Sequence, residues 1–130
     1  MESEVWGPSA WTFLHTVTLN YPEEPTNEDI KQHKIFFETL GNILPCRKCR
    51  EHYNQSIIDE PVKLDSKESL TKWLFNLHNK VNEKNNKKII EYDNFINNYR
   101  RLYGTKEYTT RIFYILILIV LVLFFLVYRK

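Results

Sequence analysis

The helical spacing of its apolar residues constrains this chain more than any other feature. Apolar positions recur every three to four residues almost throughout, a period that indicates amphipathic helices and not strands. Polar stretches containing Pro, Asn and Asp separate these segments. The predicted helix starts are Gly7-Pro8-Ser9, Thr26 with Asp29, Cys46, Ser66 or Ser69, and Asp93. We therefore predict an all-α bundle whose fifth helix ends at Gly104.

The C-terminal stretch differs from the rest. Residues 112–128 form a run of 17 residues without charge, Gly or Pro. A helix of this length spans roughly 25 Å, near the short end for crossing a hydrocarbon core. A buried core helix is the alternative, but such helices are rarely apolar on all sides in so small a domain. We predict a folded domain over 1–104, a linker over 105–111 and a transmembrane anchor over 112–128.

The N-terminus has none of the features of a signal peptide. We therefore expect a single-pass protein with a C-terminal anchor and its domain facing the cytosol. Residues 1–111 contain 16 basic and 16 acidic residues, so they have no general basic field for nucleic acid. Two cysteines in a cytosol-facing domain argue for a catalytic or metal-binding role and against a structural disulfide framework.

Those two cysteines, Cys46 and Cys49, form a C-x-x-C motif directly after Pro45. At a predicted helix start, the positive end of the helix dipole and the basic neighbours favour the thiolate form. A thiolate is the attacking species in disulfide exchange. The motif therefore indicates redox chemistry.

Other interpretations of the motif remain open from the residues alone. Cys46, Cys49 and His52 could bind zinc with His78 as a fourth ligand, although a second tight ligand pair is missing. A passive structural bridge is also possible. A thioredoxin-type motif would require a βαβ pattern, which the sequence does not show.

Two further segments could form a ligand site. Trp11 and His15 are four residues apart, so they project together from one helix face and could hold a planar heterocycle, although such a Trp often belongs to the core. His78 and Asn82 have the same spacing. A basic cluster follows them: Lys84, Lys87 and Lys88. This arrangement suits a nucleotide with its pyrophosphate, although a solvated helix end often has the same composition.

Taken together, W-G-x-x-x-W-x-x-L-H, P-C-x-x-C and H-N-x-V-N-x-K resemble the Erv/ALR family of FAD-linked sulfhydryl oxidases. The resemblance covers about residues 5–104 and is strongest to the short members of large cytoplasmic DNA viruses. It implies a four-helix bundle with a short fifth helix, usually a homodimer, that holds FAD between its helices. Asn85 departs from the family pattern, which commonly has Leu there.

The resemblance also implies the residues of the site. Cys46 and Cys49 would be catalytic, and no metal is expected. The implied FAD contacts are Gly7, Trp11, His15, Cys49, His52, Tyr53, His78, Asn79, Val81, Asn82, Lys84 and Lys87.

The implied reaction takes electrons from a partner's dithiol through Cys46 and Cys49 to FAD, and then to O2 to give H2O2. Since the chain has no second C-x-x-C, we expect a thioredoxin-like or other dithiol protein to donate directly. Viral membrane or virion proteins are the expected targets, at a host endoplasmic reticulum-derived or virion membrane. The competing hypotheses are a zinc-binding tail-anchored adaptor, using Cys46, Cys49 and His52, and a purely structural tail-anchored bundle.

Overall fold

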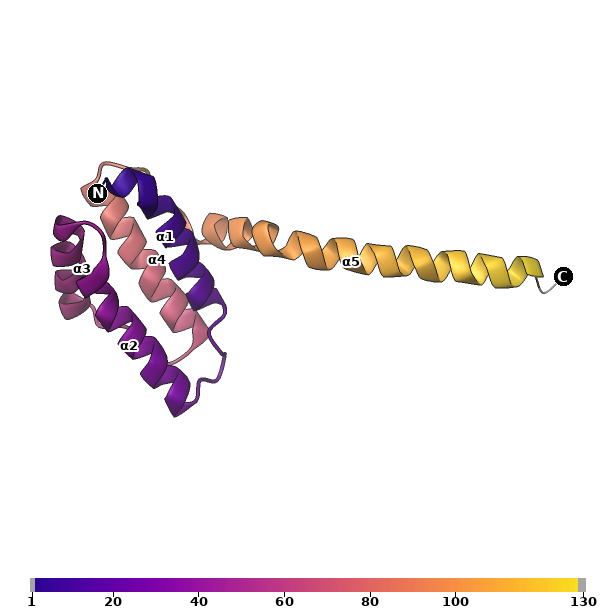
Figure 1. Cartoon of the computed structure of the whole chain (residues 1–130), viewed down its shortest axis with the longest axis horizontal. Helices are drawn as coiled ribbons and strands as arrows, with labels where there is room; N and C mark the ends of the chain where they lie inside the picture. The colour runs from indigo at the N-terminus through magenta and orange to yellow at the C-terminus, as the bar shows by residue number, and fades with distance from the viewer. Residues whose placement is uncertain (1, 129–130) are drawn as a thin grey trace. The chain divides into compact units, whose positions relative to one another are not determined.

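All regular secondary structure in the described residues is helical, which confirms the predicted all-α class. The computed structural model describes residues 2–128, apart from the side chains of residues 105–109, 123 and 127. The helices are α1 (Ser3–Leu19), α2 (Asn27–Ile43), α3 (Arg47–Asp59), α4 (Lys67–Lys84) and α5 (Tyr92–Tyr128) (Figure 1). The chain divides into two units, Met1–Ile89 with α1 to α4 and Ile90–Lys130 with α5.

Local capping signals begin three of these helices where the sequence predicted. Thr26 and Asp29 form a complete capping box at α2, in which Asp29 N–H donates to Thr26 Oγ1 over 3.2 Å and Thr26 N–H donates to Asp29 Oδ2 over 2.9 Å. Ser66 caps α4 by accepting the N–H of Ser69 over 3.2 Å. Cys46 is the N-cap of α3.

The first helix begins earlier than predicted. The sequence analysis placed its start at Gly7-Pro8-Ser9, whereas α1 begins at Ser3 and contains Pro8 in its second turn. Proline this close to a helix start removes one backbone hydrogen bond, to the carbonyl of Glu4, and the helix continues. Because the helix begins earlier, two further polar residues, Ser3 and Glu4, lie in the first turn of α1.

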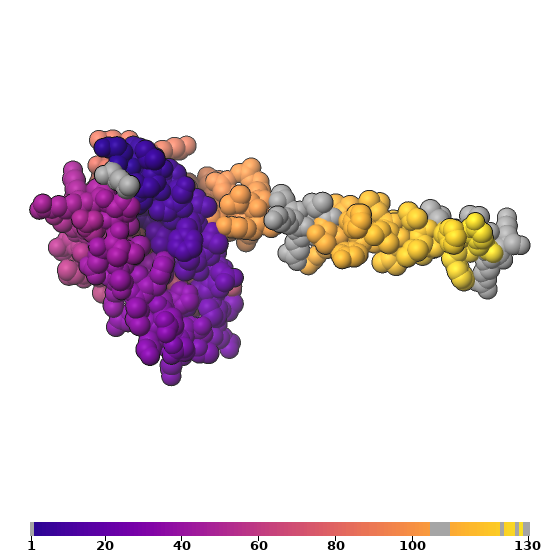
Figure 2. All heavy atoms as spheres, viewed as in Figure 1, coloured from indigo at the N-terminus to yellow at the C-terminus, as the bar shows by residue number. Residues whose placement is uncertain are grey.

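The four helices of the first unit enclose an apolar core. Helix α1 packs against α4, and α2 packs against α3 (Figure 1). The core cluster comprises Leu14, Tyr21, Phe37, Tyr53, Leu70, Trp73, Leu74 and Leu77. Two buried polar groups tie loops to this core: the Tyr21 hydroxyl donates to Leu64 O and the Trp73 indole donates to Glu60 O, both over 3.0 Å. In the space-filling view, the side chains of α1, α2 and α3 close the gaps between the ribbons (Figure 2).

The second unit corrects the prediction of a short fifth helix that ends at Gly104. Helix α5 is 37 residues long, runs through Gly104 and includes residues 105–111. A glycine inside a helix costs about 1 kcal/mol relative to alanine, which is too little to end a helix that continues on both sides of it. Within the part of the chain that the structure describes, no helix is both long and apolar enough to cross a membrane. The described residues therefore give no support to the membrane anchor predicted over 112–128.

Candidate active site

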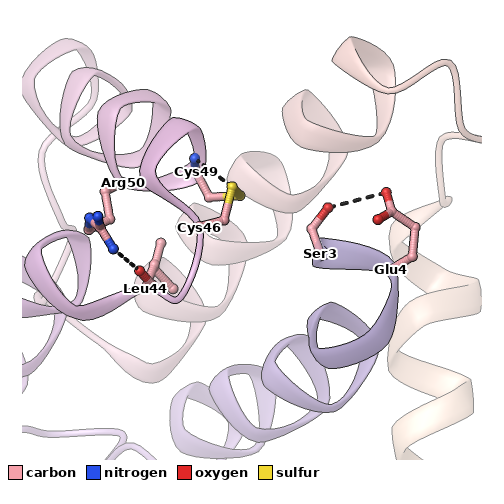
Figure 3. The surroundings of a disulfide bond; sticks show 6 residues. All are labelled: Ser3, Glu4, Leu44, Cys46, Cys49 and Arg50. Atoms are coloured by element: carbon pink, nitrogen blue, oxygen red, sulfur yellow. Dashed lines mark hydrogen bonds between the residues drawn. A yellow bond between two sulfur atoms is a disulfide. The ribbon is translucent and has the colours of Figure 1, made fainter. Parts of the chain in front are cut away.

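The start of α3 holds a disulfide between Cys46 and Cys49 (Figure 3). The two Cα atoms are 5.1 Å apart, and Cys46 Sγ accepts a hydrogen bond from the N–H of Cys49 over 3.2 Å. Both cysteines are half-buried. Because Cys46 caps the helix, its sulfur lies at the positive end of the dipole and receives an N–H. The same contacts would stabilise a Cys46 thiolate after reduction.

The loop before the disulfide is held by Arg50, whose guanidinium donates to Leu44 O over 2.5 Å. Figure 3 draws Ser3 and Glu4, from the start of α1, among the surroundings of the disulfide, with Ser3 on the side nearer to it. The Ser3 hydroxyl donates to the Glu4 carboxylate over 3.2 Å. A backbone hydrogen bond to Glu4, followed by this one from Ser3, lowers the pKa of the Glu4 carboxyl. The surroundings of the disulfide therefore include the start of α1 as well as the start of α3.

A close approach of α2 and α3 positions this disulfide. Gly41 is buried in α2, and a Cβ there would overlap the Asn54 side chain and lie 2.9 Å from the Tyr53 ring. The Tyr53 hydroxyl donates to Phe37 O over 2.8 Å, which fixes the ring, and burial raises the pKa of Tyr53. The sequence analysis missed Gly41, although an isolated glycine inside a periodic helix signals a packing role.

Three aromatic side chains from α1 and α4 form a stack. The rings of Trp11 and His78 are nearly parallel, with centroids 4.0 Å apart and an interplanar angle of 7°. His15 lies 5.9 Å from Trp11 between ring centroids, and its Nε2 is 3.0 Å from Nδ1 of His78. The predicted pairing of Trp11 with His15 is confirmed, and the contact with His78 joins two motifs that are far apart in the sequence.

Both histidines of this stack are neutral at pH 7. Burial, followed by the neighbouring His78, lowers the pKa of His15 from 6.5 to about 3. Burial, followed by the charge of Lys87, lowers the pKa of His78 from 6.5 to about 4. Two neutral imidazoles 3.0 Å apart can share one hydrogen bond, in which one ring donates and the other accepts. The stack is therefore an uncharged, flat, hydrogen-bonded surface.

The turn after α4 holds Lys87 within electrostatic reach of the stack and of Glu4 at the start of α1. Asn86 has a left-handed backbone with φ of 53°, and Lys87 N–H donates back to Asn82 O over 2.8 Å. These are features of a Schellman cap, so the predicted helix end at Asn85-Asn86 is confirmed. The charge of Lys87 lowers the pKa of both Glu4 and His78. Lys87 therefore acts electrostatically on His78 of the stack, after burial, and least of the causes on Glu4 at the start of α1.

The other predicted contact residues lie on the same helices. Asn82 is buried in α4, Asn79 and Val81 are half-buried there, and Lys84 is exposed at its end. On α3, His52 is exposed. Gly7 is half-buried in α1, and a Cβ there would meet none of the described atoms within 4 Å.

This donor set fits a flavin dinucleotide. The flat rings can stack on a heterocycle, the amides can hydrogen-bond to it, and exposed lysines can neutralise phosphates. A zinc site fits less well, because the two sulfurs are bonded to each other. In the described residues, no three His, Cys, Asp or Glu side chains converge on a metal position.

A helical bundle that has both a paired C-x-x-C at a helix start and a Trp–His stack belongs to the class of helical thiol-redox domains. Residues 8–101 match the family model described as Erv1 / Alr family. The chain belongs to this family.

Two viral relatives and one solved structure illustrate the similarity. The chain is 41% identical to "Probable FAD-linked sulfhydryl oxidase R368" of Acanthamoeba polyphaga mimivirus, over 71% of this chain and 66% of that protein. It is 31% identical to an FAD-linked sulfhydryl oxidase of African swine fever virus, over 79% of this chain and 87% of that protein. The FAD binding domain of Erv1 from Saccharomyces cerevisiae has a TM-score of 0.68 at 34% identity, covering 70% of this chain and 87% of that chain.

The similarity is partial in length for several of these proteins. The chain spans 66% of the mimiviral relative, 40% of an Arabidopsis thaliana relative and 43% of a Saccharomyces cerevisiae relative. The match therefore leaves about a third of the mimiviral protein uncovered, whereas it covers most of the African swine fever virus protein.

Proposed function

We propose that this protein is an FAD-linked thiol oxidase that forms disulfides in partner proteins. The observation that carries the proposal is the Cys46–Cys49 disulfide at the start of α3, with Cys46 as the helix cap (Figure 3). Family membership and the donor set around Trp11 and His78 add support.

The proposed exchange begins when a donor thiolate attacks Cys46. A donor–Cys46 disulfide forms, the Cys46–Cys49 bond breaks, and Cys49 leaves as a thiolate. The donor's second thiolate then attacks the donor sulfur of this mixed disulfide and releases Cys46. The hydrogen bond from Cys49 N–H and the helix dipole stabilise Cys46 as a leaving thiolate. The donor ends with a new disulfide, and the protein holds two thiols.

The second half-reaction restores the Cys46–Cys49 disulfide. Bound FAD supplies two-electron redox chemistry, accepting the electron pair and passing it to O2, which becomes H2O2. The protein's own part is to place Cys49 toward the flavin and to bind the cofactor. We propose that Trp11, His15 and His78 contact the planar parts of FAD, and that Lys84 and Lys87 neutralise its pyrophosphate.

Two serine variants test this division of roles. Cys49→Ser leaves Cys46 as a free thiol, so Cys46 should attack a donor whose accessible cysteine carries thionitrobenzoate in a mixed disulfide. The thionitrobenzoate thiolate leaves, and the donor stays joined to Cys46 by a stable disulfide, visible on a non-reducing gel. Cys46→Ser is the matched control and should trap much less. Both variants should remain yellow and lose turnover. Full oxidase activity in Cys49→Ser, or equal trapping by both variants, would contradict the proposal.

The donor and the assembly state are further parts of the proposal. A thioredoxin-like or other dithiol protein would donate directly, because the chain has no other cysteines to relay electrons. A homodimer is supported by exposed apolar side chains on α1 and α2, where Phe13 is 58% and Ile35 is 50% exposed. Light scattering on the purified protein measures the assembly state, and a strictly monomeric mass at working concentrations would exclude the dimer.

We also propose that the run 112–128 anchors the protein in a membrane with the domain on the cytosolic side. This proposal rests on the sequence of the whole run, which includes positions 123 and 127, and on the exposure of its described apolar side chains. An anchored viral oxidase of this kind would act on virion membrane proteins. Such proteins would otherwise stay reduced in the cytosol.

Membrane fractionation tests the anchor. The full chain should stay with membranes through an alkaline carbonate wash, whereas a chain ending at residue 111 should be released. External protease should digest the domain of the full chain in intact vesicles. Release of the full chain by carbonate would refute the anchor, and a protected domain would refute the cytosolic orientation.

A further inference from the structure

The second turn of α1 contains a polar atom that the proposed reaction does not use. The indole Nε1 of Trp6 is buried, and no hydrogen-bond acceptor for it exists among the residues that the structure describes. A buried N–H without an acceptor is unfavourable, so such groups usually indicate a missing water, ion or ligand. Trp73 provides the contrast, because its indole Nε1 donates to Glu60 O over 3.0 Å.

The neighbours of Trp6 place this donor at the disulfide end of the site. Ser3 lies one helical turn before Trp6, and Figure 3 draws Ser3 among the surroundings of the Cys46–Cys49 disulfide. Gly7 follows Trp6 directly, and a Cβ on it would meet none of the described atoms within 4 Å. The same turn of helix thus combines an unused donor with room for another group.

We propose that the Trp6 indole N–H donates a hydrogen bond to the flavin ring of bound FAD. The inference rests on the proposed function, in which the flavin ring must lie against the disulfide to receive electrons from Cys49. The carbonyl oxygens and nitrogens of that ring are hydrogen-bond acceptors, and they gain negative charge when the ring is reduced. A donor already fixed by packing stabilises this charge without reorganisation. Trp6 therefore both binds the oxidised ring and raises its reduction potential.

The test compares Trp6→Phe with Trp73→Phe in the full chain. Trp6→Phe should raise the Kd for FAD about tenfold, the value of one hydrogen bond. It should also lower the flavin reduction potential and change the Tm of the apoprotein less than Trp73→Phe does. Trp73→Phe removes a hydrogen bond within the protein, so it should lower the apoprotein Tm and leave the Kd for FAD unchanged. A wild-type Kd or a wild-type potential in Trp6→Phe overturns the proposal.

A second measurement needs no folded variant. The three tryptophans give three indole N–H signals in a ¹⁵N spectrum of the wild-type protein. Binding of FAD should slow hydrogen exchange of the Trp6 signal, and an unchanged exchange rate overturns the proposal. Its failure is distinct from failure of the proposed function: a wild-type protein that binds no flavin refutes the oxidase itself. A flavin-bound protein whose Trp6 exchanges freely refutes only this hydrogen bond.

Discussion

Replacement of Gly41 by alanine tests how α3, and with it the disulfide, is held against α2. The new Cβ would overlap the Asn54 side chain and lie 2.9 Å from the Tyr53 ring. Asn54 can rotate away, but Tyr53 is fixed by its 2.8 Å hydrogen bond to Phe37 O. Overpacking of this kind costs about 1–3 kcal/mol, partly offset by the higher helix propensity of alanine, near 1 kcal/mol. We expect a net loss of roughly 0–2 kcal/mol.

The assay is urea unfolding of the apoprotein, with the Tm as a second reading. For a domain of this size the loss corresponds to a fall in Tm of up to about 15 °C. Gly7→Ala is the matched control, because it adds the same methyl group to a helix at a place where the Cβ meets none of the described atoms. It should raise the stability of the apoprotein by about 0.5–1 kcal/mol.

A double-mutant cycle then isolates the contact. In an Asn54→Ala background, Gly41→Ala should cost less than it does alone, because one of its two clashes is gone. If Gly41→Ala stabilises the protein as Gly7→Ala does, the close approach of α2 and α3 is wrong. An equal cost in both backgrounds would show that Asn54 plays no part.

Three further perturbations address the turn and the histidine stack. Asn86→Val should lower stability by about 1–2 kcal/mol and Asn86→Gly should not, because residue 86 is left-handed; urea midpoints measure both, and equal midpoints contradict this. His15 stays neutral in the folded protein because its pKa is lowered. The protein therefore has its full stability only at a pH above the pKa of unfolded His15, near 6.5. Between pH 7 and pH 5, His15 should contribute a fall of about 2 kcal/mol to the free energy of unfolding and His78 should add to it, so His15→Gln should make the fall smaller. Lys87→Gln should raise the pKa of His78 and of Glu4 in NMR titrations. Unchanged pKa values would show that the Lys87 ammonium group does not lie close to these two side chains.

Local signals in the sequence predicted much of the fold. The Thr26 and Ser66 caps and the helix start at Cys46 depend on residues within one turn of each other, so spacing alone identifies them. Pro8 and Gly104 misled the prediction because both residues are common at helix boundaries and are tolerated inside helices. In each case the neighbouring turns supply enough stabilisation for the helix to continue.

The candidate site was predictable in its parts but not in its assembly. The pairing of Trp11 with His15 follows from helical geometry. The stack of Trp11 on His78 and the hydrogen bond between His15 and His78 depend on the packing of α1 against α4, which spacing does not specify. The close approach at Gly41 and the unused donor of Trp6 likewise become visible only once the helices are packed.

Anaerobic titration of the purified protein with dithiothreitol tests the central claim most directly. The claim is that a dithiol passes its electrons through the Cys46–Cys49 disulfide to a flavin held by the surrounding helices. The account predicts that the yellow protein bleaches with dithiol and regains its colour when air is admitted, forming H2O2, while Cys49→Ser stays yellow. A colourless wild-type protein, or bleaching of Cys49→Ser at the wild-type rate, would contradict it.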